Sequence, residues 1–146
     1  MIISNDQTQT ITDDDLPKVV STYIKVFSNE GEQWTEESAL KHIKQNYQKD
    51  SSWIVKQEDQ VVGFCFAILQ TREKGDELYI DSIGVLPEYQ HKGIGKILLD
   101  RAEKYAAEKQ VSELRLAANP DWESFGWYKK HSFNKTGWVD MFKELD

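Results

Sequence analysis

The segment Val85-Leu-Pro-Glu-Tyr-Gln-His-Lys-Gly-Ile-Gly-Lys96 carries the strongest structural signal in this chain of 146 residues. Pro87 ends a preceding apolar strand, and Gly93 and Gly95 lead into a long amphipathic helix. The first turn of a helix has amides without backbone partners, and the helix dipole favours an anion there. Because glycine has no side chain, phosphate oxygens can approach this backbone closely. The segment therefore predicts a phosphate or pyrophosphate site.

Three kinds of phosphate site use a glycine loop, and the sequence separates them. A P-loop requires G-x-x-x-x-G-K-[ST], which this chain does not contain. A dinucleotide-binding loop requires a third glycine, at a position where this chain has Leu98. The run Gln90-x-x-Gly93-x-Gly95 instead resembles the Q/R-x-x-G-x-G/A motif of the GNAT superfamily of acetyl-CoA-dependent N-acetyltransferases. The alternative is a glycine loop that only caps a helix.

The periodicity of apolar residues predicts the other elements. Apolar residues three and four positions apart indicate one helix after a Thr12 cap, a second from Thr35 and a third over about Ile94–Lys109. Alternating residues between turns indicate strands. The expected strands are Gln7–Ile11, Ser52–Gln57, Gln60–Leu69, Glu77–Val85 and Glu113–Ala117, followed by a helix begun by Asn119–Pro120 and a final hairpin of Phe133–Thr136 and Trp138–Leu145.

This order of elements predicts an α/β fold with a mixed sheet in a single domain, residues 1–146. Tight turns join the early strands, which should be antiparallel, whereas the unit 77–117 is long enough for a parallel crossover. We therefore expect a mostly antiparallel sheet with one parallel strand pair and helices on both faces. The same order is found in the GNAT fold, and the resemblance implies that this parallel pair splays apart.

Composition limits the classes of function. The net charge of −7 argues against non-specific nucleic-acid binding. No apolar run approaches the ~20 residues that span a bilayer, so no membrane role is expected. Met1–Asp6 has no positive region typical of a signal peptide. Cys65 is the one cysteine and lies in an apolar run, so we expect a buried thiol, no internal disulfide and a cytoplasmic location.

The resemblance to the GNAT family extends downstream and implies how acetyl-CoA is bound. Asn119, Trp127–Tyr128 and Lys129–Phe133 are similar to the family's N…FY-x-K-x-GF stretch, with Ser132 in place of glycine. The resemblance implies that the backbone near Ile83, Gly84 and Val85 pairs with the pantetheine arm and that Asn119 hydrogen-bonds that arm. The amides that would hold the pyrophosphate are those of Gln90, His91, Lys92, Gly93, Ile94, Gly95 and Lys96, with Lys92 and Lys96 adding positive charge.

Acetyl transfer to an amine also requires proton transfer. An amine with a pKa near ~10 must first lose a proton. Asp81 is the candidate base, since a carboxylate in an apolar strand is costly to bury, and we place it on one strand face with Tyr79, Ile83 and Val85. Its alternatives are a solvent contact, a structural hydrogen bond or a water chain that replaces it. A strand amide near Val85 would stabilise the oxyanion.

The resemblance implies that Tyr128 protonates the leaving thiolate, the alternative being a purely structural aromatic residue. Histidines at positions 42, 91 and 131 lack Cys or His partners at ligand spacing, so no metal site is expected.

The amine acceptor is expected to be cationic. In the family, the first two helices and the last hairpin form the acceptor cleft. Acidic and aromatic residues in these segments suit a polyamine, an aminoglycoside-like sugar or a basic protein segment, or they form only a solvated surface. They are Glu30, Glu32, Trp34, Glu36, Glu37, Trp138, Asp140, Glu144 and Asp146. The alternative function is a non-catalytic acyl-CoA-binding regulatory module, and a homodimer is compatible with either.

Overall fold

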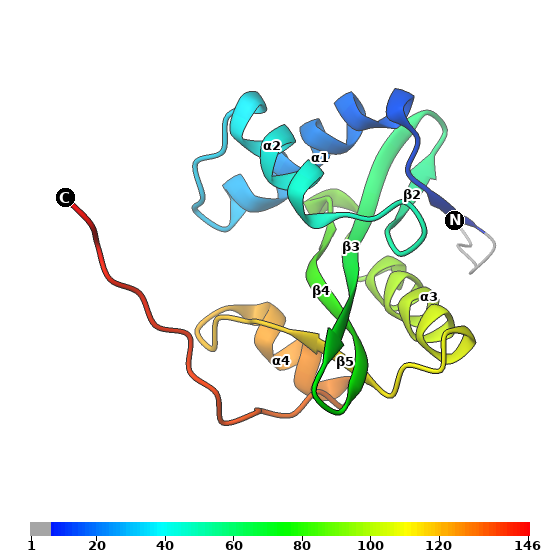
Figure 1. Cartoon of the computed structure of the whole chain (residues 1–146). Helices are drawn as coiled ribbons and strands as arrows, with labels where there is room; N and C mark the ends of the chain where they lie inside the picture. The colour runs from blue at the N-terminus through cyan, green and yellow to red at the C-terminus, as the bar shows by residue number, and fades with distance from the viewer. Residues whose placement is uncertain (1–6) are drawn as a thin grey trace. The chain divides into compact units, whose positions relative to one another are not determined.

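A computed structural model of the chain describes residues 7–146, and the first six residues, which the signal-peptide prediction concerns, lie outside the described part. Contacts divide the chain into two compact units, Met1–Leu116 and Ala117–Asp146. Each is described by itself below (Figure 1). No helix in the described part is long and apolar enough to cross a bilayer.

The first unit is built on a mixed sheet. Within the described residues the sheet has five strands in the order β1-β2-β3-β4-β5. They are β1 (Thr8–Thr10), β2 (Trp53–Gln57), β3 (Gln60–Arg72), β4 (Gly75–Val85) and β5 (Glu113–Leu116). The pairs from β1 to β4 are antiparallel, and β4 pairs with β5 in parallel. The predicted sheet is therefore confirmed, with β3 and β4 extended further toward their common turn than expected.

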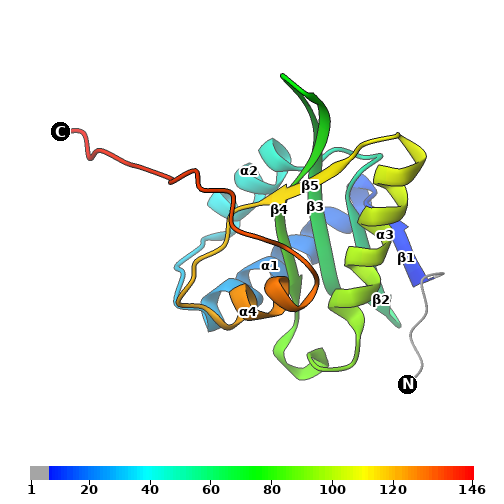
Figure 2. The ribbon, with the colours of Figure 1, turned by 90° about the horizontal axis from the view of Figure 1, so that it is seen from below.

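Helices cover both faces of this sheet, as predicted (Figure 2). They are α1 (Leu16–Asn29), α2 (Glu36–Asn46) and α3 (Ile94–Glu108). A side chain at Gly63 would point at Ile94 of α3, with its Cβ 2.9 Å from Ile94 Cγ2. The next residue, Phe64, contacts Tyr23 of α1, with ring centroids 5.6 Å apart. Because successive strand residues face opposite ways, α1 and α3 lie on opposite faces.

Local hydrogen bonds form near the start of the first two helices. Thr12 is the N-cap of a short 3-10 helix, Asp13–Asp15, that precedes α1, whose own N-cap is Asp15, and Thr35 is the N-cap of α2 as predicted. The Thr12 backbone amide donates to Asp15 Oδ2 at 2.9 Å, just before α1. Thr35 Oγ1 accepts from the Ser38 amide at 3.0 Å at the start of α2. Burial alone would raise the pKa of Asp15, but hydrogen bonds from Lys56 and Thr12 lower it overall.

The core between α1 and the sheet is aromatic. Phe64 and Phe66 stack at 4.8 Å, and both are fully buried. Each contributes roughly 1.5–3 kcal/mol through burial. A Cβ at Gly84 would lie 2.4 Å from Phe64 Cζ, so only glycine fits at that point of β4. Cys65, between the two phenylalanines, is fully buried as predicted, and burial raises the pKa of its thiol to about 12.

The second unit contains the helix α4 (Glu123–Lys130). The prediction that this helix begins at Asn119–Pro120 is wrong. Asn119 Oδ1 accepts from the Asp121 amide at 2.9 Å, which forms a turn before the helix, and Trp122 is the N-cap.

The predicted final hairpin is also wrong, since no strand occurs among residues 131–146. An isolated hairpin is marginal in water, so an alternating pattern alone does not form one. The large apolar side chains of this segment are 77–88% exposed: Trp138, Val139, Met141, Phe142 and Leu145.

Candidate active site

The parallel strands β4 and β5 separate after a short paired stretch. Their pairing begins at Glu77↔Glu113 and ends at Ile80↔Leu116. β4 continues for five more residues, 81–85, with no β5 partner in the described structure. On its other side, the segment 83–85 remains paired with β3. In this described segment the β5 side of β4 therefore lacks a strand partner, and the pantetheine contacts expected of Ile83, Gly84 and Val85 stay a prediction.

The glycine loop follows directly. Gln90 Nε2 donates to the Val85 carbonyl at 3.1 Å and ties the loop to the end of β4. Gly93 is the N-cap of α3 with φ +86°, a left-handed conformation that favours glycine. A Cβ at Gly93 would meet nothing within 4 Å, so the space above it is open. The Ile97 amide donates to the carbonyl of this N-cap at 3.1 Å, and the amides of the helix turn before Ile97 have no i−4 partner inside the helix.

The residues predicted to hold pyrophosphate differ in accessibility. Gln90, His91, Lys92, Gly93 and Lys96 are exposed, Gly95 is half-buried, and the Ile94 side chain is in the core. The Lys96 ammonium pairs with Asp100 at 3.0 Å, while the Lys92 ammonium lies 5.5 Å from the Tyr89 ring centroid. Because Lys96 is already paired, the predicted anion site would depend more on the backbone amides and Lys92 than on Lys96.

Asp81 occupies a β-bulge in β4. The register with β3 passes from Phe66↔Ser82 to Ala67↔Ile80 and skips Asp81. An inserted residue bends the strand and redirects its side chains. The strand opposite is held at this point by Ser52 Oγ, which accepts from the Ala67 amide at 3.1 Å. This hydrogen bond fixes β3 opposite the bulge.

The bulge corrects one sequence prediction. Val85 pairs with Gly63, whose Cβ position faces α3, so Val85 and Ile83 face α3. Asp81 instead contacts α2, on the opposite face of the sheet. The predicted common face of Asp81 with Ile83 and Val85 is wrong because the extra residue reverses the alternation of side chains.

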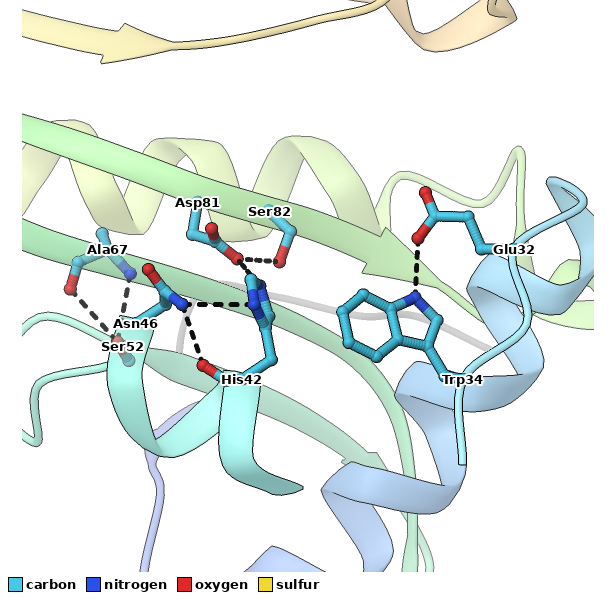
Figure 3. Close-up of polar contacts among 8 residues, drawn as sticks. All are labelled: Glu32, Trp34, His42, Asn46, Ser52, Ala67, Asp81 and Ser82. Atoms are coloured by element: carbon cyan, nitrogen blue, oxygen red, sulfur yellow. Dashed lines mark hydrogen bonds and ion pairs between the residues drawn. The ribbon is translucent and has the colours of Figure 1, made fainter. Parts of the chain in front are cut away.

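Asp81 lies in a network of hydrogen bonds with α2 (Figure 3). His42 Nε2 is 3.0 Å from Asp81 Oδ2, and Ser82 Oγ donates to the same oxygen at 3.3 Å. Asn46 Nδ2 is 3.3 Å from His42 Nδ1 and donates to the His42 carbonyl at 2.9 Å. The side chain of Asp81 is 17% exposed and that of His42 is 28% exposed. Asp81 is thus held by hydrogen bonds and still reaches solvent.

The contact of His42 with Asp81 was not predicted from the sequence, where the histidines stood only as possible metal ligands. The available signal was the spacing of His42 and Asn46, four residues apart on one helix face. In the described structure no group of three or more His, Cys, Asp or Glu side chains is arranged to hold a metal ion.

Aromatic rings border the network. The Trp34 ring centroid lies 5.1 Å from that of His42 and 5.3 Å from that of Tyr23. Trp34 Nε1 donates to Glu32 Oε1 at 2.6 Å. The pKa of Tyr23 is raised by burial, and further by the negative charges of Asp81 and Glu32. Of the predicted acceptor residues, Trp34 therefore lies beside His42 and Tyr23, and Glu32 is bonded to Trp34, whereas Glu30, Glu36 and Glu37 are exposed.

The second unit holds Tyr128 in α4 at a well-defined helix end. The Phe133 amide donates to the Tyr128 carbonyl at 3.1 Å, and the Ser132 amide donates to Lys129 O at 3.2 Å. The rings of Tyr128 and Phe133 are 5.5 Å apart. This is a Schellman motif, whose C′ residue adopts a left-handed backbone, and Ser132 has φ +73°. The motif accounts for the glycine that the family has at the position of Ser132.

The family model described as the acetyltransferase (GNAT) family matches residues 16–133. The chain is 31% identical over 78 residues to an uncharacterized N-acetyltransferase of Chlorobaculum tepidum. That match covers 53% of this chain and 44% of the relative, so it spans less than half of the relative's length.

Solved structures share the fold at low sequence identity. A predicted acetyltransferase with acetyl-CoA from Clostridium acetobutylicum has a TM-score of 0.75 at 18% identity, covering 92% of this chain and 94% of that one. An aminoglycoside 6′-N-acetyltransferase from Acinetobacter haemolyticus has a TM-score of 0.73 at 19% identity, covering 95% and 99%. A ribosomal-protein-alanine N-acetyltransferase from Brucella melitensis biovar Abortus has a TM-score of 0.74 at 17% identity, covering 94% and 99%.

Proposed function

Because the chain belongs to the GNAT acetyltransferase family, we propose that it transfers the acetyl group of acetyl-CoA directly to a primary amine. The observation that carries this proposal is the arrangement of β4. Within residues 81–85 this strand contains a hydrogen-bonded carboxylate and a backbone edge without a β5 partner, and it leads into the glycine loop. In this proposal one segment would supply a base, an acyl-donor site and an anion site.

The groups of this chain fit acetyl-CoA, which supplies the thioester whose acetyl group is transferred. The open edge at Ile83–Val85 would bind the pantetheine arm, as a strand binds its neighbour. The amides at the start of α3 and the loop before it, Gln90–Lys96, would bind the pyrophosphate. Asn119 would use its amide nitrogen toward the cofactor arm, because its Oδ1 already accepts from Asp121.

Two residues would handle the protons. The ammonium group of the acceptor gives one proton to Asp81, which releases it to solvent. As the N–C bond forms and the C–S bond breaks, Tyr128 donates its hydroxyl proton to the departing sulfur. The second amine proton then returns through solvent to Tyr128. The products are an amide, a free thiol and one proton. An amide of β4 near Val85 would stabilise the oxyanion.

The acceptor is proposed to be a cationic amine, either a polyamine or aminoglycoside-like molecule or a protein amine. Glu32 and Asp81 flank the rings of Tyr23 and Trp34, and acids beside aromatic faces suit an ammonium group. The aminoglycoside and ribosomal-protein enzymes named above share this fold but have different acceptors, so the acceptor is argued from these residues alone. A homodimer and a cytoplasmic location stay predictions.

The experiment is thiol release from acetyl-CoA with a panel of polyamines, aminoglycosides, amino acids and lysine-rich peptides. A parallel measurement follows the melting temperature with acetyl-CoA alone. Release that depends on one amine class, together with a raised melting temperature, is the expected result. A raised melting temperature without release by any amine would instead support the non-catalytic acyl-CoA-binding module. The absence of both thiol release and a raised melting temperature would overturn the proposal.

A further inference from the structure

His42 and Asn46 lie on α2, outside the segments that the proposed reaction uses. The hydrogen bonds around His42 determine which ring nitrogen carries the proton. Asn46 Nδ2 donates to the His42 carbonyl at 2.9 Å, so the amide nitrogen of Asn46 faces this end of the helix. The same nitrogen is 3.3 Å from His42 Nδ1, and because an amide nitrogen only donates, Nδ1 must accept. A neutral His42 therefore carries its proton on Nε2.

That proton points at the proposed base. His42 Nε2 lies 3.0 Å from Asp81 Oδ2 and donates to it, and Ser82 Oγ donates to the same oxygen. Both of these bonds use Oδ2, and within the described part of the chain Oδ1 of Asp81 has no hydrogen bond, so this oxygen remains for the acceptor amine. The carboxylate is thus fixed through one oxygen while the other stays available.

We propose that His42 is a positioning residue for acetyl transfer: as the Nε2–H tautomer selected by Asn46, it orients Asp81 so that Oδ1 meets the acceptor amine. This inference rests on the proposed function. His42 does not itself take the amine proton, because both of its ring nitrogens are already in hydrogen bonds. Its role corresponds to a second group that orients a catalytic carboxylate.

The surroundings of His42 favour this role over simple packing. The ring lies 5.1 Å from Trp34 and 5.9 Å from Tyr23, centroid to centroid, so it cannot turn without disturbing both. The bulge in β4 supplies the matching constraint on Asp81. A rigid ring and a fixed carboxylate make the 3.0 Å contact directional, which is what a reaction sensitive to the position of its base requires.

Two substitutions of His42 distinguish the effect of its hydrogen bond to Asp81 from the effect of its ring packing. His42→Gln places an amide nitrogen near the position of Nε2, whereas His42→Asn places one near Nδ1, too short to reach Asp81. Both remove the ring contacts with Trp34 and Tyr23. We expect His42→Asn to lower kcat by about 10- to 100-fold, as loss of positioning does, and His42→Gln to recover most of the wild-type kcat. The KM for acetyl-CoA should stay unchanged in both variants.

A second measurement does not depend on turnover or on the stability of these variants. Nitrogen NMR of the wild-type imidazole should show a protonated Nε2 and an unprotonated Nδ1. In Asn46→Ala, Nε2 should stay protonated through its bond to Asp81, while the fraction of rings with a proton on Nδ1 should rise, because the donor that faces Nδ1 is gone. Wild-type protein with the proton on Nδ1 would sink the inference even if His42→Asn failed to fold.

The outcomes distinguish the two proposals. Equal kcat in His42→Asn and His42→Gln, with wild-type turnover intact, overturns the positioning role and leaves the acetyltransferase function standing. Wild-type protein that releases no thiol with any amine overturns the function, and with it the role assigned to His42. Loss in His42→Asn with rescue in His42→Gln supports both.

Discussion

His42 Nε2 and Asp81 Oδ2, from residues 39 positions apart, are 3.0 Å apart and join α2 to the bulge of β4. This contact settles one alternative raised by the sequence, since Asp81 is hydrogen-bonded by the protein and is not merely a solvent contact at a strand edge. A structural hydrogen bond and a catalytic role are compatible, because the bond uses one carboxylate oxygen. A substitution that keeps the shape of the Asp81 side chain but removes its ability to take up a proton separates the structural role from the catalytic role.

Asp81→Asn provides that change. The amide keeps an oxygen that can accept from His42 but cannot take up a proton. We expect kcat to fall by roughly 10²- to 10⁴-fold, the usual contribution of a general base, with acetyl-CoA binding unchanged in calorimetry. Asp76→Asn, at an exposed position of the same strand, is the control and should retain wild-type kcat. Full activity in Asp81→Asn would favour a water chain as the base.

Gly93→Ala tests the anion site. Gly93 has φ +86° and Gly75 has φ +121°, and neither position would crowd a Cβ. Alanine at either position should destabilise the protein by about 1–2 kcal/mol, because an L-residue resists a left-handed backbone. Only Gly93→Ala should weaken acetyl-CoA binding in calorimetry, since its methyl group intrudes on the phosphate oxygens. Equal acetyl-CoA affinity in both variants would place the pyrophosphate elsewhere.

Much of the first unit was predictable because its signals are local. The capping bonds at Thr12 and Thr35 form within three residues along the chain, so the sequence contains both partners. The glycine loop is likewise local, and Gly93 adopts the left-handed backbone that only glycine favours. Features of this kind depend little on the rest of the fold.

The features that escaped prediction depend on distant segments. The bulge at Asp81 is a mismatch of one residue between β3 and β4, which appears only when the strands are paired. The role of His42 requires a partner on another element. In the segment Trp138–Leu145, apolar and polar residues alternate as they do in a strand. This pattern shows that the residues suit a strand, but a strand forms only when a neighbouring strand pairs with it.

Tyr128→Phe tests the proposed proton donor. Removing the hydroxyl keeps the ring contact with Phe133 at the end of α4, so folding should be retained. We expect kcat to fall by roughly 10²-fold or more, as loss of a general acid does, with the acetyl-CoA thermal shift preserved. Tyr105→Phe, in the core of α3, is the control and should keep wild-type kcat. Unchanged kcat in Tyr128→Phe would leave Tyr128 a structural aromatic residue.

Ser132→Gly should stabilise the protein. Ser132 occupies the left-handed position of the Schellman motif with φ +73°, where glycine avoids a cost of about 1 kcal/mol. The same change inside α4, Ser124→Gly, should destabilise by about 0.5 kcal/mol because glycine is a poor helix former. The two free energies of unfolding, from urea titrations, should therefore change in opposite directions. A loss of stability in Ser132→Gly would contradict the role assigned to the motif.

Cys65 should be unreactive in the folded protein. It is fully buried, and burial raises the pKa of its thiol from 9.0 to about 12. At pH 8 the thiolate fraction is then about one in 10⁴, and the thiolate is the reactive form. An aromatic disulfide reagent should give no signal from the native chain and one equivalent after unfolding in guanidinium. Reaction of the native protein at the rate of a free thiol would contradict this burial.

The same thiol adds a pH dependence to stability above pH 9. Between about 9 and 12 the unfolded thiol ionises while the folded thiol stays protonated, so the unfolded state binds fewer protons. The stabilisation is therefore present below pH 9 and is lost as the pH rises, with a limiting slope of about 1.4 kcal/mol per pH unit. Cys65→Ala should lack this dependence, so the free energy of unfolding of the wild type should fall relative to that of the variant between pH 8 and 10, as measured by urea unfolding. Parallel stability curves over that range would show that Cys65 ionises equally in both states.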